Sequence, residues 1–353
     1  MIDTISASLS KLDQGKSLSQ NEAYSTFLSV MSGAVSHVQI CKLLTLLQTK
    51  GETVDEIAGA TRAMRELVTN VHINLPNVVD TCGTGGSGAQ KLFNVSTAAA
   101  FVAAAAGVNI AKHGNRAASS TSGSADVLEA GGINIDITPD QISQCVSETG
   151  IGFMFAQAHH SAMRHAMPAR RELGIRTIFN LVGPLSNPAS APNQVVGVFA
   201  EQWQKPMVDV LQLLGSKRVL SVHADGLDEL SIGGPSLVVE LIDGNKRSYT
   251  LKPSDVGLKE HTLGPLKADS IESSLALIYA ALSETNIAAR DIVALNAGAS
   301  IYVAGLTTNI RQGVELALEV IANKKAMHKW QALARLTTTM ANSNTELNTG
   351  PNT

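Results

Sequence analysis

Between residues 80 and 126, short apolar runs alternate with turns rich in glycine or hydroxyl groups and with helical stretches. An apolar run at 78–79 leads into the glycine-rich turn 83–88, and an alanine-rich helix is expected at 97–106. A second apolar run, 108–111, then starts the same order again. This order predicts a β-α-β unit, in which the turns meet at the carboxyl ends of parallel strands.

Both turns carry groups that bind anions. Glycines let backbone N–H groups approach an anion closely, and a helix N-terminus adds partial positive charge. The second turn adds full charge from Lys112 and Arg116, and the stretch 119–124 adds hydroxyl donors. A glycine turn alone could be a plain connector. With its basic and hydroxyl-rich neighbours, it predicts a ligand that has two separated phosphate groups.

The alternation continues along the chain. Further strands are expected at 133–135, 150–155, 195–199 and 218–223, with helices near 125–130, 139–149 and 202–214. The pattern predicts a large α/β domain with a mainly parallel, buried sheet, made of residues 73–163 and 189–340. The polar stretch 341–353 is expected to be disordered.

Residues 1–72 are expected to form a small α-helical domain. Ser36 and Thr53 are candidate helix caps, and Glu56 would complete a capping box. Several apolar faces of such a bundle would remain to be covered. They could pack against a partner subunit or against the larger domain, and the sequence favours neither.

Composition excludes several classes of protein. The chain has 353 residues, is 44% hydrophobic, and carries a net charge of -3 without a dense basic block, so nucleic acid is not an expected partner. The N-terminus lacks a signal-peptide pattern, and the most apolar stretch, 98–108, is too short to span a membrane. Cys41, Cys82 and Cys145 are scattered, which is typical of reduced thiols in a cytoplasmic protein.

Two adjacent carboxylates, Asp228 and Glu229, follow the expected strand that ends at His223. At the carboxyl end of a strand beside a phosphate site, they would suit Mg²⁺, which prefers oxygen ligands. A solvated acidic turn is an equally good interpretation. Ser96 could add a hydroxyl ligand, and it is also expected to cap the alanine-rich helix.

Among the basic residues, Arg170 could pair with a substrate carboxylate, or it could lie on a solvated helix face. His113 could donate to phosphate or substrate. His159 and His160 are expected to pack or to form hydrogen bonds, because no other metal ligand stands at a suitable spacing. We find no catalytic acid, base or nucleophile in the sequence, which favours catalysis by positioning and electrostatics.

The segments GTGGSG, NVST, KHGNRAASS, SGSADVLEA, RELGIRTIFNLVGPLSNP and GLDELS resemble those of the anthranilate phosphoribosyltransferase family. The resemblance covers nearly the whole chain except the tail. It implies a fold similar to pyrimidine nucleoside phosphorylases, a homodimer formed by the helical domain, and a segment 164–188 that returns to that domain. It also implies an enzyme of tryptophan biosynthesis that joins anthranilate to phosphoribosyl pyrophosphate. An association with anthranilate synthase stays open.

The resemblance also implies roles for individual residues. The residues implied to bind phosphoribosyl pyrophosphate are Gly83, Gly86, Ser87, Lys91, Asn94, Val95, Ser96, Thr97, Lys112, His113, Gly114, Asn115, Arg116, Ala117, Ala118, Ser119, Ser120 and Ser124. Gly83, Asn115 and Arg170 are implied to bind anthranilate, and Ser96, Asp228 and Glu229 to bind two Mg²⁺ per subunit.

The sequence departs from the family pattern in the glycine loop. Ser87 stands where the family usually has Asp, and one extra residue precedes Asn94. Lys91 could compensate as a phosphate ligand. Two other functions are considered: a pyrimidine nucleoside phosphorylase of the same fold, and a non-enzymatic nucleic-acid-binding relative, which the net charge disfavours.

Overall fold

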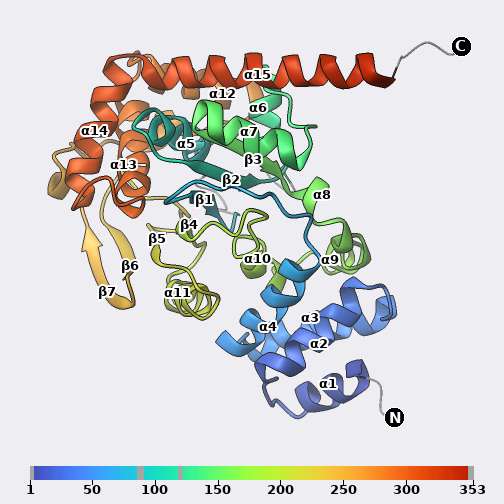
Figure 1. The fold of residues 1–353 in the computed structure, drawn as a ribbon. Helices are drawn as coiled ribbons and strands as arrows, with labels where there is room; N and C mark the ends of the chain where they lie inside the picture. The colour runs from blue at the N-terminus through green and yellow to red at the C-terminus, as the bar shows by residue number, and fades with distance from the viewer. Residues whose placement is uncertain (1–3, 86–90, 118–121, 349–353) are drawn as a thin grey trace, which may run out of the picture.

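A computed structural model describes residues 4–85, 91–117 and 122–348. The N-terminal helices form a bundle beside a larger α/β part, which contains one mostly parallel sheet (Figure 1). The fold class predicted from the sequence is confirmed.

Four helices make up the bundle. They are α1 (Thr4–Asp13), α2 (Gln20–Met31), α3 (His37–Lys50) and α4 (Val54–Glu66). Of these, α2, α3 and α4 each begin at a capping box. Ser36 and Thr53 cap α3 and α4 as predicted, each within a capping box. Glu56 completes the box of α4, and its buried carboxylate also accepts from the Leu18 amide at 2.9 Å and from Lys50 Nζ at 2.9 Å.

One seven-stranded sheet, in the order β3-β2-β1-β4-β5-β6-β7, forms the centre of the larger part. The strands are β1 (Val79–Gly83), β2 (Ile110–Gly114), β3 (Ile151–Phe155), β4 (Asn193–Gly197), β5 (Arg218–His223), β6 (Ser236–Ile242) and β7 (Asn245–Leu251). The first five are parallel, and β6 and β7 add an antiparallel edge. The strand expected at 133–135 is wrong, because this segment is extended and buried at Ile133 and Ile135 but joins no ladder.

The remaining helices follow the strands along the chain. They are α5 (Val95–Ala105), α6 (Ser124–Ala130), α7 (Pro139–Thr149), α8 (Ala156–His159), α9 (Met167–Leu173), α10 (Ile178–Val182), α11 (Gln204–Leu213), α12 (Ile271–Leu282), α13 (Ile287–Val303), α14 (Ile310–Ala322) and α15 (Lys325–Asn348). Short 3-10 helices occupy Ser161–His165, Glu201–Trp203, Pro253–Val256 and Gly264–Leu266. No helix in the described ranges combines the length and the apolarity that a membrane crossing requires.

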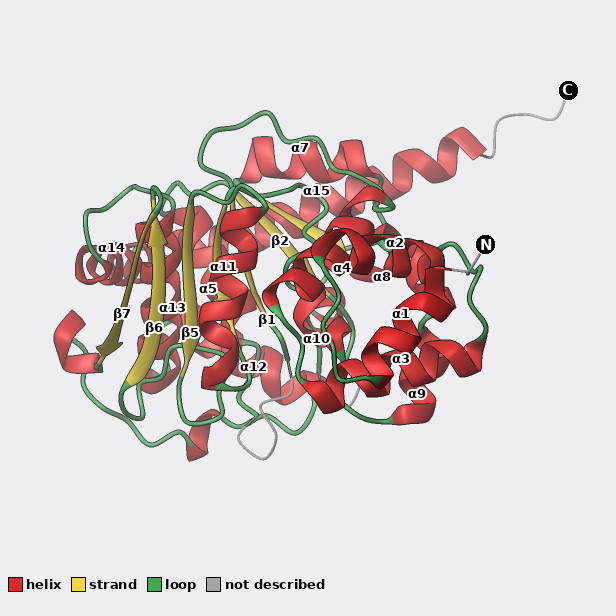
Figure 2. Cartoon of the chain, turned by 90° about the horizontal axis from the view of Figure 1, so that it is seen from below, coloured by secondary structure: helices red, strands yellow, loops and turns green. Residues whose placement is uncertain are grey.

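Helices cover the two faces of the sheet. On one face, α5 and α13 pack against the strands, with α12, α14 and α15 behind them. On the other face, α11 packs against β5 and β6 (Figure 2). The bundle shares this second core: a single hydrophobic cluster runs from α1–α4 through α10 and α11 to β4–β6. Phe27 of α2 meets Phe179 of α10 edge to face, with 5.6 Å between the ring centroids. The bundle therefore buries part of its apolar surface on the larger part.

The C-terminal helix is longer than the sequence suggested. The Trp330 indole donates to the Gly131 carbonyl at 3.0 Å, and its ring lies 4.5 Å from that of Phe101. This packing fixes the helix, and adding further turns to an existing helix costs little. Residues 341–348 continue α15, and the other residues of the stretch expected to be disordered, 349–353, lie outside the described part.

Candidate functional site

The carboxyl ends of the parallel strands gather the loops that carry the candidate residues. Strand β1 ends at Gly83, β2 at Gly114, β4 at Gly197 and β5 at His223. Because these strands are parallel, the loops that follow them leave from the same edge of the sheet. The glycine loop, the basic loop and the acidic loop therefore share one edge.

Asp228 connects the glycine loop to the acidic loop. Its Oδ2 accepts from the Gly85 amide at 2.8 Å. A Cβ atom at Gly83 would overlap the Asp228 carboxylate, and a Cβ at Gly197 would overlap the Asp228 main chain. Two strand ends thus need glycine to admit this residue. Arg176 reaches the same loop, since its Nη1 donates to the Gly85 carbonyl at 3.1 Å.

Glu229 lies at the N-terminus of α5. Its Oε1 accepts from the Ser96 amide at 3.1 Å, and the N-cap residue, Asn94, makes no side-chain cap of its own. The interpretation of Ser96 as the helix cap is therefore wrong. A carboxylate at this position is stabilised by the partial positive charge of the helix end. Burial and the neighbouring Asp228 nevertheless raise the pKa of Glu229 to about 8.

Lys112 supplies a buried positive charge beside this helix end. Its Nζ donates to the Thr81 carbonyl at 2.5 Å and to Ser96 Oγ at 3.3 Å. Burial lowers the pKa of Lys112, and nearby Asp80 opposes that shift.

The oxygen donors around this point fit a magnesium ion. They are the Ser96 hydroxyl and the carboxylates of Asp228 and Glu229, which are the ligand types that Mg²⁺ prefers. The raised pKa of Glu229 reports in part repulsion between the two carboxylates, and a divalent cation would relieve it.

The basic loop after β2 is folded back onto α6. Arg116 forms ion pairs with Glu129 and, at 3.3 Å, with Asp126. Asp126 also accepts from the Ala117 amide at 3.0 Å. The Ser124 hydroxyl donates to the Asn115 carbonyl at 3.4 Å, close against Gly114. The charge of Arg116 is thus balanced by acids of α6, whereas that of Lys112 faces the helix end.

Lys91 and Asn94 join the far end of the glycine loop to the hydroxyl-rich loop. Lys91 Nζ donates to the Ser122 carbonyl at 2.9 Å. Asn94 Oδ1 accepts from Ser122 Oγ at 2.9 Å and from Ser274 Oγ at 2.7 Å. These contacts connect the two predicted phosphate loops to each other.

The chain matches a glycosyl transferase family helical bundle domain over residues 7–68 and a glycosyl transferase family a/b domain over residues 75–327. A protein of Methylococcus capsulatus named anthranilate phosphoribosyltransferase is 50% identical over 336 residues, which are 95% of this chain and 98% of that protein. One of Cellvibrio japonicus with the same name is 51% identical, over 94% of this chain and 98% of its own. The chain belongs to the anthranilate phosphoribosyltransferase family.

Solved structures of the family agree with this fold. The crystal structure of anthranilate phosphoribosyltransferase from Thermus thermophilus matches with a TM-score of 0.89 at 44% identity, over 94% of this chain and 99% of that chain. The Saccharomyces cerevisiae enzyme in complex with phosphoribosyl pyrophosphate and Mg shares the fold, with a TM-score of 0.86 at 24% identity, over 96% of this chain and 99% of its own.

Arg170 differs from Arg116 and Arg176 in its surroundings. It lies half-buried on α9, with its guanidinium 5.6 Å from the Phe179 ring and Nη1 donating to Met167 Sδ at 3.7 Å. Burial lowers its pKa. Within residues 4–85, 91–117 and 122–348, no acidic side chain forms an ion pair with it. Such a cation is available to a carboxylate from outside the chain.

The histidines form hydrogen bonds, as expected. His160 Nε2 lies 3.2 Å from His113 Nε2, and His159 Nδ1 lies 2.7 Å from the Thr69 carbonyl. Burial lowers the pKa of His113 and lowers that of His160 to about 4. Both rings are therefore neutral at pH 7, and one nitrogen of the pair must donate to the other.

Several predicted residues can be placed only in part. Val95 and Thr97 are buried in the first turn of α5, where the Thr97 hydroxyl has no hydrogen-bond partner in the described ranges. Five residues implied by the resemblance lie outside those ranges, namely Gly86, Ser87, Ala118, Ser119 and Ser120.

Two residues at this edge were not predicted from the sequence. Arg176 stacks on Phe199, with its guanidinium carbon 3.9 Å from the ring centroid, and contacts the glycine loop. Gly197 makes room for Asp228. Arg176 lies within the RELGIRTIFN segment quoted for the family, which was a usable signal, but nothing in the local sequence marks Gly197.

Proposed function

We propose that this chain transfers the phosphoribosyl group of phosphoribosyl pyrophosphate to the amine of anthranilate, releasing pyrophosphate. One observation supports the proposal most strongly: the glycine loop, the buried Lys112 and the carboxylates of Asp228 and Glu229 come together at the N-terminus of α5. The chain that has this arrangement belongs to the anthranilate phosphoribosyltransferase family. The product would be N-(5-phosphoribosyl)anthranilate.

The binding roles are divided between the two loops and α9. Phosphoribosyl pyrophosphate would lie against the glycine loop, the first turn of α5 and the loop from Lys112 to Ser124. Anthranilate would lie beyond Gly83, the last residue of β1, and Asn115, which follows the neighbouring strand β2, with its carboxylate paired to Arg170. The free charge of Arg170 supports this assignment.

Ser96, Asp228 and Glu229 would hold Mg²⁺, with two ions per subunit as the family resemblance implies. The bound cation would offset negative charge on the departing pyrophosphate. The chain itself would place Lys112 and the glycine-loop amides near the same oxygens, where a fixed positive environment lowers the barrier without reorganisation.

The acceptor amine needs no strong base. An aromatic amine is neutral at pH 7 and already nucleophilic, so the barrier lies in breaking the bond between the ribose C1 and the pyrophosphate oxygen. The amine would attack the opposite face of C1 and invert it. The chain then has to align the two substrates and exclude water, which would otherwise hydrolyse the activated sugar.

The helical bundle would also form a homodimer. Val38 of α3 is 75% exposed, the highest value among the large hydrophobic side chains in the described ranges. This face of the bundle is free in one copy of the chain and would be covered by the second copy.

The direct test is the loss of anthranilate fluorescence when the purified chain is mixed with phosphoribosyl pyrophosphate and Mg²⁺. We expect turnover that depends on all three components and stops when Mg²⁺ is chelated. Phosphate with thymidine or uridine, in place of these substrates, serves as the control for a nucleoside phosphorylase. Cleavage of either nucleoside without any loss of anthranilate would overturn the proposal.

A further inference from the structure

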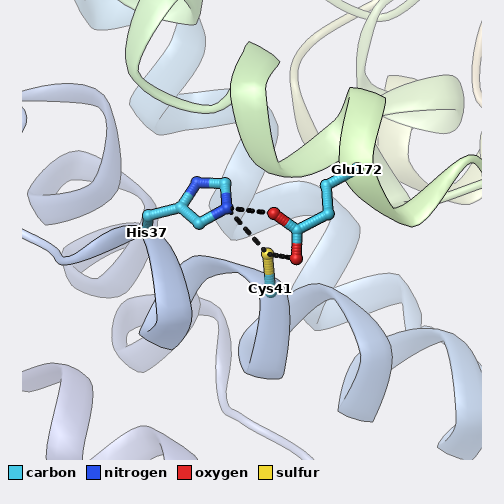
Figure 3. A group of neighbouring side chains, drawn as sticks. All are labelled: His37, Cys41 and Glu172. Carbon is cyan, nitrogen blue, oxygen red and sulfur yellow. Dashed lines mark hydrogen bonds and ion pairs between the residues drawn. The ribbon is translucent and has the colours of Figure 1, made fainter.

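His37, Cys41 and Glu172 bring an imidazole, a thiol and a carboxylate together where α3 meets α9 (Figure 3). Their ligand atoms all lie within 4.8 Å of one another. We propose that these three side chains bind Zn²⁺ and that the ion joins α3 to α9.

The local structure places two of the ligands on one helix face. His37 is the first residue of α3 and Cys41 stands four positions later, so the two side chains point the same way. The capping box at Ser36 fixes this first turn. Glu172 comes from α9, which packs against α3 although it is distant in the sequence.

The distances are close to those of a metal site. In a tetrahedral zinc site, the bond lengths to nitrogen, sulfur and oxygen place the ligand atoms about 3.4–3.6 Å from one another. Cys41 Sγ lies 3.7 Å from His37 Nε2 and 3.9 Å from Glu172 Oε1. The third pair, His37 Nε2 and Glu172 Oε2, forms a hydrogen bond of 2.5 Å, which would open by about 1 Å to admit the ion.

The ligand types select the metal. A thiolate with an imidazole and one carboxylate suits Zn²⁺, whereas Mg²⁺ prefers oxygen ligands alone. In a single copy of the chain the side chains of His37 and Glu172 are 43% and 65% exposed, which leaves room beside them for water as a fourth ligand. Zn²⁺ would therefore bind between α3 and α9, and Mg²⁺ would bind at the N-terminus of α5.

A cysteine beside a histidine could instead be a nucleophile, but the surroundings of Cys41 argue against this. An activated cysteine has a lowered pKa. Here burial and the negative charge of Glu172 raise the pKa of the Cys41 thiol. A bound cation would reverse this effect, because zinc coordination releases the thiol proton.

The experiment is a cobalt titration of the chelator-treated, full-length chain with Mg²⁺ present to fill oxygen sites. We expect one equivalent of Co²⁺ to give the spectrum of a tetrahedral complex with a thiolate-to-cobalt charge-transfer band, and Zn²⁺ to displace it. His37→Gln and Cys41→Ser should raise the Zn²⁺ Kd by at least about tenfold to a hundredfold, the loss seen when even a residue hydrogen-bonded to a ligand is changed.

His328→Gln removes an exposed helical histidine elsewhere and is the matched control, with binding expected to equal that of the wild type. Circular dichroism of each variant shows whether it has folded. Retention of the charge-transfer band in folded Cys41→Ser, or equal Zn²⁺ affinity in wild type and folded His37→Gln, would overturn the site. Because the readout needs neither substrate, this result is independent of the phosphoribosyl transfer assay.

Discussion

Arg170 and Arg116 show how the surroundings of a residue decide its use. Arg116 forms ion pairs with Glu129 and Asp126 of α6, so its positive charge is neutralised within the chain. Arg170 is half-buried beside Phe179 without an acidic partner in the described ranges. A buried, unbalanced cation is costly unless an anion joins it. The substrate carboxylate is the anion that the proposed reaction provides.

Replacing Arg170 with Ala should raise the KM for anthranilate about ten- to a hundredfold, the worth of a hydrogen bond to a charged group. The KM for phosphoribosyl pyrophosphate should change little. Arg171→Ala, which removes an exposed neighbouring arginine, is the control. Steady-state kinetics with each substrate varied would measure both values. An equal rise in both KM values would remove Arg170 from the acceptor site.

The buried His160 should make the chain sensitive to acid. Its pKa is lowered to about 4 in the folded state, against about 6.5 when unfolded. The unfolded chain therefore takes up the proton first, and the free energy of unfolding should fall by up to about 3 kcal/mol as the pH drops from 6.5 to 4. Urea unfolding at several pH values would measure this, and His160→Gln should flatten the slope while His328→Gln leaves it unchanged. Parallel slopes for both variants would contradict the assignment.

At the scale of elements, the end of β4 is held in place by the acidic loop after β5. Gly197 lies directly against the Asp228 main chain, so a methyl group there must push the acidic loop away from the glycine loop. This is a packing constraint rather than a conformational one.

We expect Gly197→Ala to reduce the free energy of unfolding by about 1–3 kcal/mol, the usual cost of overpacking, and to weaken phosphoribosyl pyrophosphate binding. Gly234→Ala is the matched control, because a Cβ there meets nothing within 4 Å. Urea unfolding and calorimetric titration would test both effects. Unchanged binding in Gly197→Ala would show that the acidic loop can shift without consequence.

The sequence predicted the elements that local signals mark. The caps at Ser36 and Thr53 and the parallel strands β1–β5 follow from residue type and periodicity. The β6–β7 hairpin was missed, and it breaks the β-α-β order with a direct antiparallel turn. Residues 341–348 are polar, and their helix depends on the turns anchored by Trp330.

The site could be predicted less completely, because proximity in space leaves no local mark. Glycines, hydroxyls and charged residues indicated where the phosphate loops lie. The pairing of Arg116 with α6 and the contact of Gly197 with Asp228 arise only when separate elements meet. The role of Arg176 depends in the same way on the loop between α9 and α10 reaching the glycine loop.

At the scale of the whole molecule, the exposed Val38 on α3 bears on assembly. If this face forms the homodimer, Val38→Glu should shift the chain from dimer to monomer by burying a charge without a partner. Leu213→Glu on α11, which is 59% exposed, is the control and should leave the assembly unchanged. Sedimentation equilibrium would measure the mass of each. A dimer that survives Val38→Glu would place the contact elsewhere.

The hydrophobic cluster that joins α1–α4 to α10, α11 and β4–β6 has a consequence for how the chain can be divided. The two parts match separate family domains, but they share this cluster, and among the described residues the bundle has no hydrophobic cluster made of its own residues alone. A fragment ending near residue 72 would leave Phe27 and its neighbours open to water, and the remainder would lose the cover of Phe179. The bundle is therefore unsuited to being cut out and grafted onto another protein, and the chain should melt as one unit.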